Sequence, residues 1–399
     1  MYAEDVIVPK LQMNLGSPAE GAFEINSAHT NDPLCALDRA KVSKARKIVV
    51  KVGTAVVSRA SDGRLALGRI GNLIEQIEVL ARSGRQVILV TSGSVGAGRQ
   101  RIRREQIFNS SPLELQSLNQ SSEDVANIAE TQKRAAAACG QSGLMALYDL
   151  LFSHMDLACS QLLITRNDFL SADFRAGLTQ TVDHLLKMNV IPVFNENDAI
   201  SYHSRTETIE DLKASGRFWD NDSLAMVLAK QLQADLLVCL TDVEGLFDAA
   251  PDLPDSKLIP TYSPVVHDKI IKFGAKSTMG RGGMSSKVES AWEAAMGGVT
   301  TLIVNGKGFR PALVEAVSGE VVGTLFDKDA AERVRKDHAH VAHSRNTEEK
   351  VLRQLADEEH AKDTITVETD DFVAAKAVDE TSTDPENLMP TPQAIGVTV

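Results

Sequence analysis

The sequence predicts an α/β protein, a three-layer α/β/α sandwich with a mainly parallel central sheet. Short β-branched runs alternate along the chain with longer segments whose apolar residues recur at helical spacing. Glycine-rich or polar clusters follow these runs directly, as in the turns of βαβ units. The 399 residues, 43% hydrophobic and 24% charged, suffice for one large domain or two smaller ones. Ligands of such sheets bind beyond the carboxyl ends of the strands, so the polar clusters mark the candidate site.

The first βαβ unit is predicted between residues 47 and 98. KIVVKV at 47–52 has the pattern of a buried parallel strand, and QVILV at 86–90 has the same pattern. Between them, helical spacing is kept by Leu67, Ile70, Leu73, Ile74, Ile77 and Leu80.

The same alternation continues to the end of the domain. We expect further helices over 133–152, 174–188, 222–231 and 284–296. We expect further strands over 158–165, 190–194, 235–240 and 300–304.

The composition predicts a domain flanked by two irregular segments. Residues 1–45 are predicted to form a flexible N-terminal arm, and residues 46–328 the domain. Within the domain, the polar residues 102–130 are predicted to form a surface insertion loop. Residues 329–399 read as an acidic and largely disordered tail, since 331–399 hold 15 acidic and 8 basic residues. Up to about residue 362 this tail could form a solvated helix.

Charge and hydropathy argue against several classes of protein. A net charge of −12 speaks against nucleic-acid binding. No apolar run approaches the roughly 18–20 residues that span a bilayer, and the N-terminus resembles no signal peptide, so we expect a cytoplasmic protein. The cysteines show no metal-binding spacing and read as reduced thiols; they are Cys35, Cys139, Cys159 and Cys239.

Lysine and glycine at the strand ends point to an anion site. Lys51 stands inside an apolar strand, either snorkelling to water or aimed past the strand end at an anion. Glycines at the two strand exits would let backbone amides approach a ligand; they are Gly53, Gly93, Gly96 and Gly98. The glycine loop 279–287 leads into a helix with Lys287 in its first turn, a second candidate anion site.

Carboxylates and carboxamides crowd two segments, NEND at 195–198 and DND at 220–222. Burying such groups unpaired costs several kcal/mol, so they belong to a site that handles an amino group, a metal or a lysine. Two lysines, an acidic cluster and glycine loops together suggest phosphoryl transfer from a nucleotide, with Asp222 holding both lysines.

Six ordered motifs carry a resemblance to a known family. They are KVGT at 51–54, VTSGSVGAG at 90–98, FNENDAIS at 194–201, FWDNDSLA at 218–225, LTDVEGLF at 240–247 and GRGGMSSK at 280–287. Over about residues 47–326 the chain resembles glutamate 5-kinases of the amino acid kinase family. FWDND and GRGGM are most similar to the kinase half of eukaryotic pyrroline-5-carboxylate synthases.

The resemblance implies a role for each matching residue. Lys51 and Lys287 would stabilise the transferring phosphoryl group, and Asp222 would organise them. The glutamate site would comprise Ser92, Gly93, Asn195, Asp198 and Asn221. The ATP site would comprise Lys51, Gly53, Thr54, Thr241, Asp242, Arg281, Gly282, Gly283, Met284, Ser285, Ser286 and Lys287.

The activity implied is ATP-dependent phosphorylation of the γ-carboxylate of glutamate, the first step of proline biosynthesis. Mg²⁺ would arrive with ATP, and no metal site of the protein's own is expected. Proline would be a feedback inhibitor and the protein a homo-oligomer. Neither a reductase half nor a small C-terminal domain is expected after the kinase domain. A related carboxylate or carbamate kinase, or a catalytically silent regulatory protein, remains the alternative.

Overall fold

The computed structural model describes residues 39–109, 125–201, 208–215, 220–271 and 283–337. The chain divides into two compact units, Met1–Val334 and Arg335–Val399, and nearly all described residues belong to the first. The predicted arm up to residue 38, Arg281, Gly282 and the tail after residue 337 lie outside the described residues.

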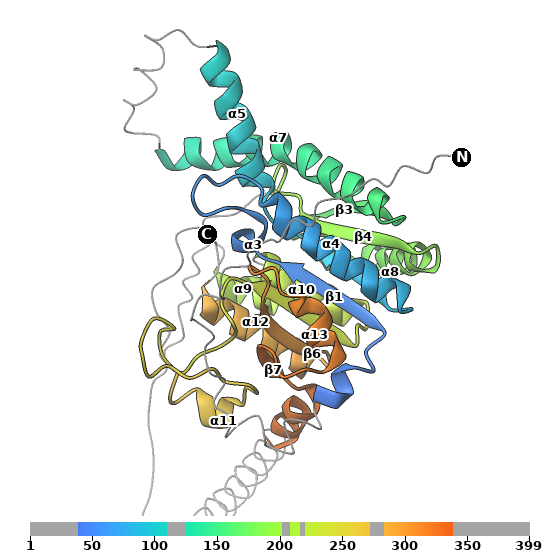
Figure 1. The fold of residues 1–399 in the computed structure, drawn as a ribbon, viewed down its shortest axis with the longest axis vertical. Helices are drawn as coiled ribbons and strands as arrows, with labels where there is room; N and C mark the ends of the chain where they lie inside the picture. Colours follow the sequence, from blue (N-terminus) through green and yellow to red (C-terminus); the bar gives the residue numbers. More distant parts are fainter. Residues whose placement is uncertain (1–38, 110–124, 202–207, 216–219, 272–282, 338–399) are drawn as a thin grey trace, which may run out of the picture. The chain divides into compact units, whose positions relative to one another are not determined.

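A mainly parallel sheet forms the centre of the first unit (Figure 1). Its order is β3-β4-β2-β1-β5-β6-β7, and only the pairing of β7 with β6 is antiparallel. The strands are β1 (Lys47–Val52), β2 (Gln86–Val90), β3 (Ala158–Ile164), β4 (Val190–Glu196), β5 (Leu236–Thr241), β6 (Thr300–Asn305) and β7 (Thr324–Phe326). The predicted fold class and each predicted strand are confirmed.

Helices cover both faces of the sheet, which makes the three layers. One core contains the buried residues of α4 (Leu67–Arg82), α7 (Val125–His154) and α13 (Ala312–Ser318). The other contains those of α8 (Ala172–Lys187), α10 (Asn221–Gln231) and α12 (Met284–Met296). Successive strand residues point to opposite faces, so β1 places Val50 in the first core and Val49 in the second.

The topology creates two switch points along the carboxyl edge of the sheet. The connections that follow β1 and β2 run through α4 and α7 on one face, whereas those that follow β4 and β5 run through α10 and α12 on the other. In the sheet, β2 lies beside β4 and β1 lies beside β5. The chain therefore leaves the sheet in opposite directions at two places, which is where open α/β sheets bind ligands.

The remaining elements are short, apart from α5 (Ser94–Asn109). They are α3 (Thr54–Val57), the 3₁₀ turn η1 (Asp168–Leu170), α9 (Ile209–Ala214) and α11 (Pro264–His267). No described helix is both long and apolar enough to cross a membrane.

The prediction of a loop over 102–130 is wrong at both ends. Residues up to Asn109 belong to α5, and α7 begins at Val125, while 110–124 lie outside the described residues. The two helices pack closely through glycines: a Cβ added at Gly140 would lie 1.9 Å from the carbonyl oxygen of Ser94 and 2.4 Å from the amide nitrogen of Gly98. Gly98 thus serves helix packing, since a Cβ there would lie 1.7 Å from the carbonyl oxygen of Ala136.

Arg39 joins the start of the described chain to the end of the domain. Its guanidinium is almost fully buried and donates to the carbonyls of Val322, Pro260 and Gly323 at 2.7, 2.8 and 3.0 Å. A buried guanidinium needs such acceptors, because its desolvation is costly without them. Arg39, which the composition assigned to the flexible arm, is therefore part of the domain.

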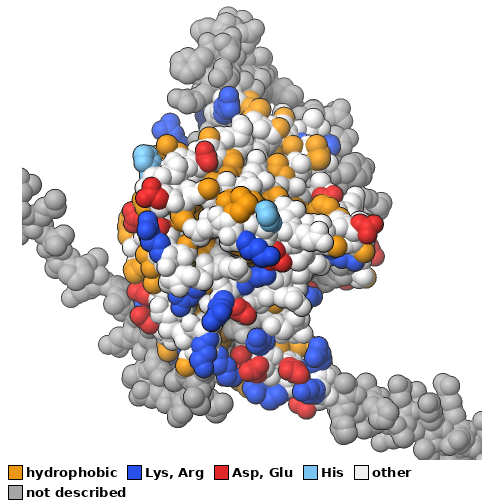
Figure 2. All heavy atoms as spheres, turned by 90° about the vertical axis from the view of Figure 1, so that its right-hand side faces the viewer, with side chains coloured by type: hydrophobic (Ala, Val, Ile, Leu, Met, Phe, Trp, Pro, Cys, Tyr) orange, Lys and Arg blue, Asp and Glu red, His pale blue; other side chains and the backbone are white. Residues whose placement is uncertain are grey.

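The face of the molecule drawn in Figure 2 carries basic and acidic side chains interspersed with apolar ones. Most of the basic side chains in this view gather in its lower half, with acidic side chains beside them.

Candidate functional site

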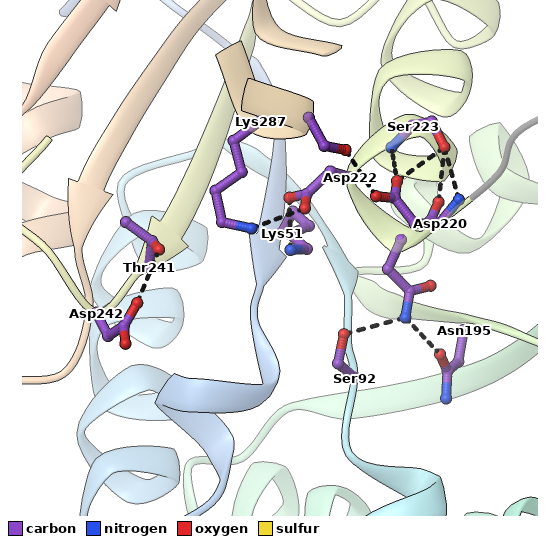
Figure 3. A network of polar contacts seen from close by, with 11 residues as sticks. Lys51, Ser92, Asn195, Asp220, Asp222, Ser223, Thr241, Asp242 and Lys287 are labelled. Carbon is purple, nitrogen blue, oxygen red and sulfur yellow. Dashed lines mark hydrogen bonds and ion pairs between the residues drawn. The ribbon is translucent and has the colours of Figure 1, made fainter. Parts of the chain in front are cut away.

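Lys51, Asp222 and Lys287 form a buried ion cluster beside the carboxyl edge of the sheet (Figure 3). Lys51 Nζ lies 2.5 Å from Asp222 Oδ1 as a close ion pair, and Lys287 Nζ donates to Asp222 Oδ2 at 2.9 Å. The side chains of Lys51 and Asp222 are each 5% exposed, and that of Lys287 is 16% exposed. The structure thus brings together the two lysines predicted to stabilise a phosphoryl group and the aspartate predicted to organise them.

The local sequence explains how Asp222 reaches the lysines. Asp220 caps α10: its side chain accepts from the backbone N–H of Ser223, and Ser223 Oγ in turn accepts from the backbone N–H of Asp220. This capping box fixes the first turn of the helix, which contains Asp222. Asp220 Oδ2 also accepts from Ser286 Oγ at 2.9 Å, so the starts of α10 and α12 are linked directly.

Electrostatics keep this cluster charged. Burial by itself raises the pKa of Asp222, but the ammonium groups of Lys51 and Lys287 outweigh it and hold this pKa far below its usual range. Burial lowers the pKa of Lys287, yet the Asp222 carboxylate more than compensates and leaves it raised. One carboxylate thus faces two ammonium groups, and these three residues carry one net positive charge.

Three predicted glutamate-site residues meet at the switch point between β2 and β4. Asn221 Nδ2 donates to Ser92 Oγ at 3.0 Å and to Asn195 Oδ1 at 3.3 Å. Asn195 is 1% exposed, and Asn221 Oδ1 is buried with no hydrogen-bond partner in the described part of the chain. A buried acceptor without a donor is uncommon in native proteins and is typical of functional sites.

Gly93 and Asp198 complete the predicted residues at this switch point. Gly93 has φ +108°, and a Cβ there would meet Val57 Cγ2 at 2.9 Å, so the turn after β2 requires glycine. Asp198 is half-buried in the loop after β4, and its backbone N–H donates to the carbonyl of Glu196. Both lie at the carboxyl edge, as predicted.

The switch point between β1 and β5 holds the residues predicted for the nucleotide. Gly53 follows β1, Thr54 begins α3, and Thr241 ends β5, where its hydroxyl donates to Asp242 Oδ1 at 3.3 Å (Figure 3). The amide of Gly53 donates to the carbonyl of Leu240 at 3.1 Å, so it holds the two strand ends together. The prediction that this amide faces a ligand is therefore wrong.

The glycine loop is described from Gly283 onward. Gly283 is the N-cap of α12, and Met284, Ser285, Ser286 and Lys287 form its first turn. The positive end of the helix dipole and the side chain of Lys287 thus lie at the same edge of the sheet. Arg281 and Gly282 lie outside the described residues.

Four residues of the site were given no role of their own in the sequence analysis, although Asp220 stands in the DND cluster and Ser94 in the VTSGSVGAG motif. Asp220 could have been found from its capping pattern, an Asp three residues before a Ser. Gln141 and Tyr148 contact the strand ends from inside α7: Asn195 Nδ2 donates to Gln141 Oε1 at 2.9 Å, and Tyr148 Oη lies 2.7 Å from Thr91 Oγ1. Ser94 Oγ also accepts from Asn195 Nδ2, at 3.4 Å.

This arrangement is suited to an anion that spans the two switch points. The ammonium groups lie beside the sheet edge, a hydroxyl and two carboxamides lie on one side of them, and Thr241 with Asp242 lies on the other (Figure 3). Buried and pre-oriented ammonium groups stabilise developing negative charge far better than mobile ones in water. The site therefore favours transfer of a charged group between two ligands.

Comparison with known proteins agrees with this geometry. The family model described as "Amino acid kinase family" matches residues 46–305. The delta-1-pyrroline-5-carboxylate synthase of Solanum lycopersicum is 52% identical over 292 residues, 73% of this chain and 39% of that protein. The glutamate 5-kinase of Geobacter sulfurreducens is 35% identical over 314 residues, 78% of this chain and 75% of that protein.

The chain thus spans 39% of the length of that synthase and three quarters of that kinase. Among solved structures, an isopentenyl phosphate kinase covers 70% of this chain with a TM-score of 0.45 and 15% identity, too distant to carry an argument. The family model covers more than half of the chain, and the glutamate 5-kinase relative is similar over most of its own length. By these two matches, the chain belongs to the amino acid kinase family.

Proposed function

We propose that the protein is a glutamate 5-kinase, which transfers the γ-phosphoryl group of ATP to the γ-carboxylate of L-glutamate and begins proline biosynthesis. The observation that carries this proposal is the Lys51–Asp222–Lys287 cluster, held beside the sheet edge that bears both switch points. The names of the relatives that share this domain support the choice of reaction.

The reaction makes one bond and breaks one bond. A γ-carboxylate oxygen attacks the terminal phosphorus of ATP, and the bond from that phosphorus to the bridging oxygen breaks, giving glutamyl 5-phosphate and ADP. A carboxylate is already ionised at neutral pH, so no general base has to remove a proton. The protein's task is to position the groups and neutralise charge, which two ammonium groups can do.

We assign the switch point between β2 and β4 to glutamate. Ser92, Asn195 and Asn221 offer a hydroxyl and carboxamides, with Gly93 and Asp198 beside them. Carboxamide and carboxylate oxygens accept hydrogen bonds, which suits an ammonium group. They therefore favour a free amino acid over an N-acetylated one.

We assign the switch point between β1 and β5 to the nucleotide. Gly53, Thr54, Thr241 and Asp242 border it, and the first turn of α12 adds the positive end of a helix dipole. Arg281 and Gly282 are assigned to the nucleotide site from their place in the sequence motif alone. Mg²⁺ would be bound mostly by phosphate oxygens and water.

The proposal also includes the regulation, the oligomeric state and the cellular location of the protein. Proline acting as an inhibitor, a homo-oligomer and a cytoplasmic location are all expected of a protein with this activity. The thiol state of Cys139, Cys159 and Cys239 is in keeping with a reducing compartment.

The deciding experiment is glutamate-dependent ADP formation with Mg-ATP, in which hydroxylamine traps the acyl phosphate as a hydroxamate. N-acetylglutamate and aspartate run in parallel as substrates of related carboxylate kinases. We expect hydroxamate from glutamate alone. Hydroxamate from another acid would assign the protein to a sibling activity, and no substrate-dependent turnover would favour a catalytically silent regulatory protein.

A further inference from the structure

Three side-chain amides form a relay that ends at Ser92. Gln141 Oε1 accepts from Asn195 Nδ2 at 2.9 Å, and Asn195 Oδ1 accepts from Asn221 Nδ2 at 3.3 Å. Asn221 Nδ2 also donates to Ser92 Oγ at 3.0 Å. The relay thus runs from α7 across the end of β4 to the start of α10 and the turn after β2.

The relay has a direction, because each amide has a donor end and an acceptor end. Gln141 presents its oxygen, so Asn195 turns its NH₂ group toward α7 and its oxygen toward Asn221. Asn221 then turns its NH₂ group toward Asn195 and Ser92. As a result Ser92 Oγ accepts a hydrogen bond and keeps its own proton for another acceptor, while Asn221 Oδ1 is left for a donor.

We propose that Gln141 is a positioning residue that fixes the polarity of this relay, so that Ser92 presents a hydroxyl donor to the carboxylate substrate. This inference rests on the proposed function. Without the acceptor at Gln141, Asn195 Nδ2 keeps only the 3.4 Å contact with Ser94 Oγ, a hydroxyl that can donate as well as accept. Asn195 and Asn221 can then both turn over. Ser92 would then donate its proton to Asn221 Oδ1 and present a lone pair to an anion, which repels it.

The fold holds the backbone of α7 in place on both sides of Gln141. Gly140, the preceding residue, packs so closely against α5 that a Cβ there would lie 1.9 Å from the carbonyl oxygen of Ser94. Two turns further along α7, the buried hydroxyl of Tyr148 lies 2.7 Å from Thr91 Oγ1, next to Ser92. One helix therefore supports both the first and the last member of the relay.

The test compares two substitutions at one position. Gln141→Leu removes the acceptor, whereas Gln141→Glu keeps it, because a carboxylate can only accept. The loss of a hydrogen bond from a hydroxyl to a charged ligand weakens binding by about 10- to 100-fold. We expect Gln141→Leu to raise the KM for glutamate by about tenfold or more with an unchanged KM for Mg-ATP, and Gln141→Glu to stay near wild type.

Gln231→Leu is the matched control. Gln231 is half-buried on α10, and its amide donates to Thr179 Oγ1 at 3.2 Å, away from the strand ends that form the site. The Gln231→Leu variant also loses a side-chain amide, but at a position outside the site. We therefore expect its KM values to remain those of the wild type. A rise in KM for glutamate in this variant equal to that in Gln141→Leu would overturn the proposal.

A double-mutant cycle with Ser92→Ala tests whether Gln141 acts through Ser92. We expect Ser92→Ala to raise the KM for glutamate in the wild type and to have little further effect in the Gln141→Leu protein. Additive effects, or a Gln141→Leu enzyme indistinguishable from wild type, would overturn the inference and leave the proposed function standing. A wild-type enzyme that forms no hydroxamate would overturn the proposed function, and the inference with it.

Discussion

A single carboxylate determines the character of the ion cluster. Asp222 has two ammonium groups for partners, so removing its charge would leave Lys51 and Lys287 facing each other with little exposure to water. Such like-charge contact at a buried position is strongly destabilising. The residue therefore matters for folding as well as for the proposed reaction.

Lys287 is the member of the cluster whose loss is best tolerated by the fold, because it is the most exposed of the three. We expect Lys287→Met to lower kcat by about 10²–10³-fold, as expected for a group that neutralises transition-state charge. Circular dichroism and the thermal midpoint should stay close to those of wild type. Near-normal turnover would show that this lysine has no part in phosphoryl transfer.

The depressed pKa of Asp222 predicts how stability depends on pH. A carboxyl whose pKa is lower in the folded state than its unfolded value of about 3.9 stabilises the fold above that pH. This contribution declines as the pH falls below about 4 toward the folded pKa. We expect Asp222→Asn to be less stable than wild type at pH 7 and the gap to narrow by pH 3, measured by denaturant unfolding. A gap that is constant from pH 7 to pH 3 would contradict the assignment of the shift to Asp222.

Sequence reasoning reached the residues at strand ends and at helix starts, and missed those that approach from the middle of a helix. Lys51, Ser92 and Asn195 stand in or directly after apolar runs, where a parallel sheet gathers polar groups. Asp222 stands in an acidic cluster at the start of a helix. Gln141 gives no such signal, since a single Gln in an Ala-rich helix has the same local pattern whether it faces water or a carboxamide.

At the scale of elements, the strands were the most predictable part. Apolar runs mark the six parallel strands to within two residues, because buried parallel strands need apolar side chains on both faces. The short antiparallel strand β7 was not predicted. Helix α5 was missed because SVGAGRQRIRREQIFN contains no apolar stripe. It packs through close backbone contact at glycine, which leaves no periodic pattern in the sequence.

Two glycines of α7 allow a matched test of that packing. A Cβ at Gly140 would overlap the backbone of α5, whereas a Cβ at Gly143 would meet nothing within 4 Å. We expect Gly140→Ala to destabilise the protein by about 1–3 kcal/mol, because the helices must move apart. Gly143→Ala should stabilise it by up to about 1 kcal/mol through helix propensity. Equal midpoints in urea for the two variants would show that the helix contact contributes nothing.

At the scale of the whole molecule, the proposed site combines segments that lie far apart in the sequence of the first compact unit. Lys51 comes from β1, Asp222 from α10 and Lys287 from α12, and the contacts between them involve no residue beyond position 287. The amino-acid composition indicates that a folded domain is present, but it does not give the residues at its boundaries. Those boundaries depend on contacts between distant residues, such as the hydrogen bonds of Arg39.

This division of the chain predicts the result of a truncation. Deleting 363–399 removes none of the contacts described for the site, so we expect kcat and both KM values to stay within about twofold of wild type. Steady-state assays of the purified truncated protein provide the measurement. A large fall in turnover or in the yield of folded protein would show that this segment takes part in the domain.

The Arg39 contacts also have a consequence for synthesis. Arg39 leaves the ribosome 221 residues before Pro260 and 283 residues before Val322, the carbonyls to which it must donate. A nascent chain stalled or cleaved before that point carries this guanidinium without those acceptors, and its central strand β1 still awaits β5 if it is shorter than 236 residues. The burial of this guanidinium is therefore one of the last steps that a newly made domain can complete.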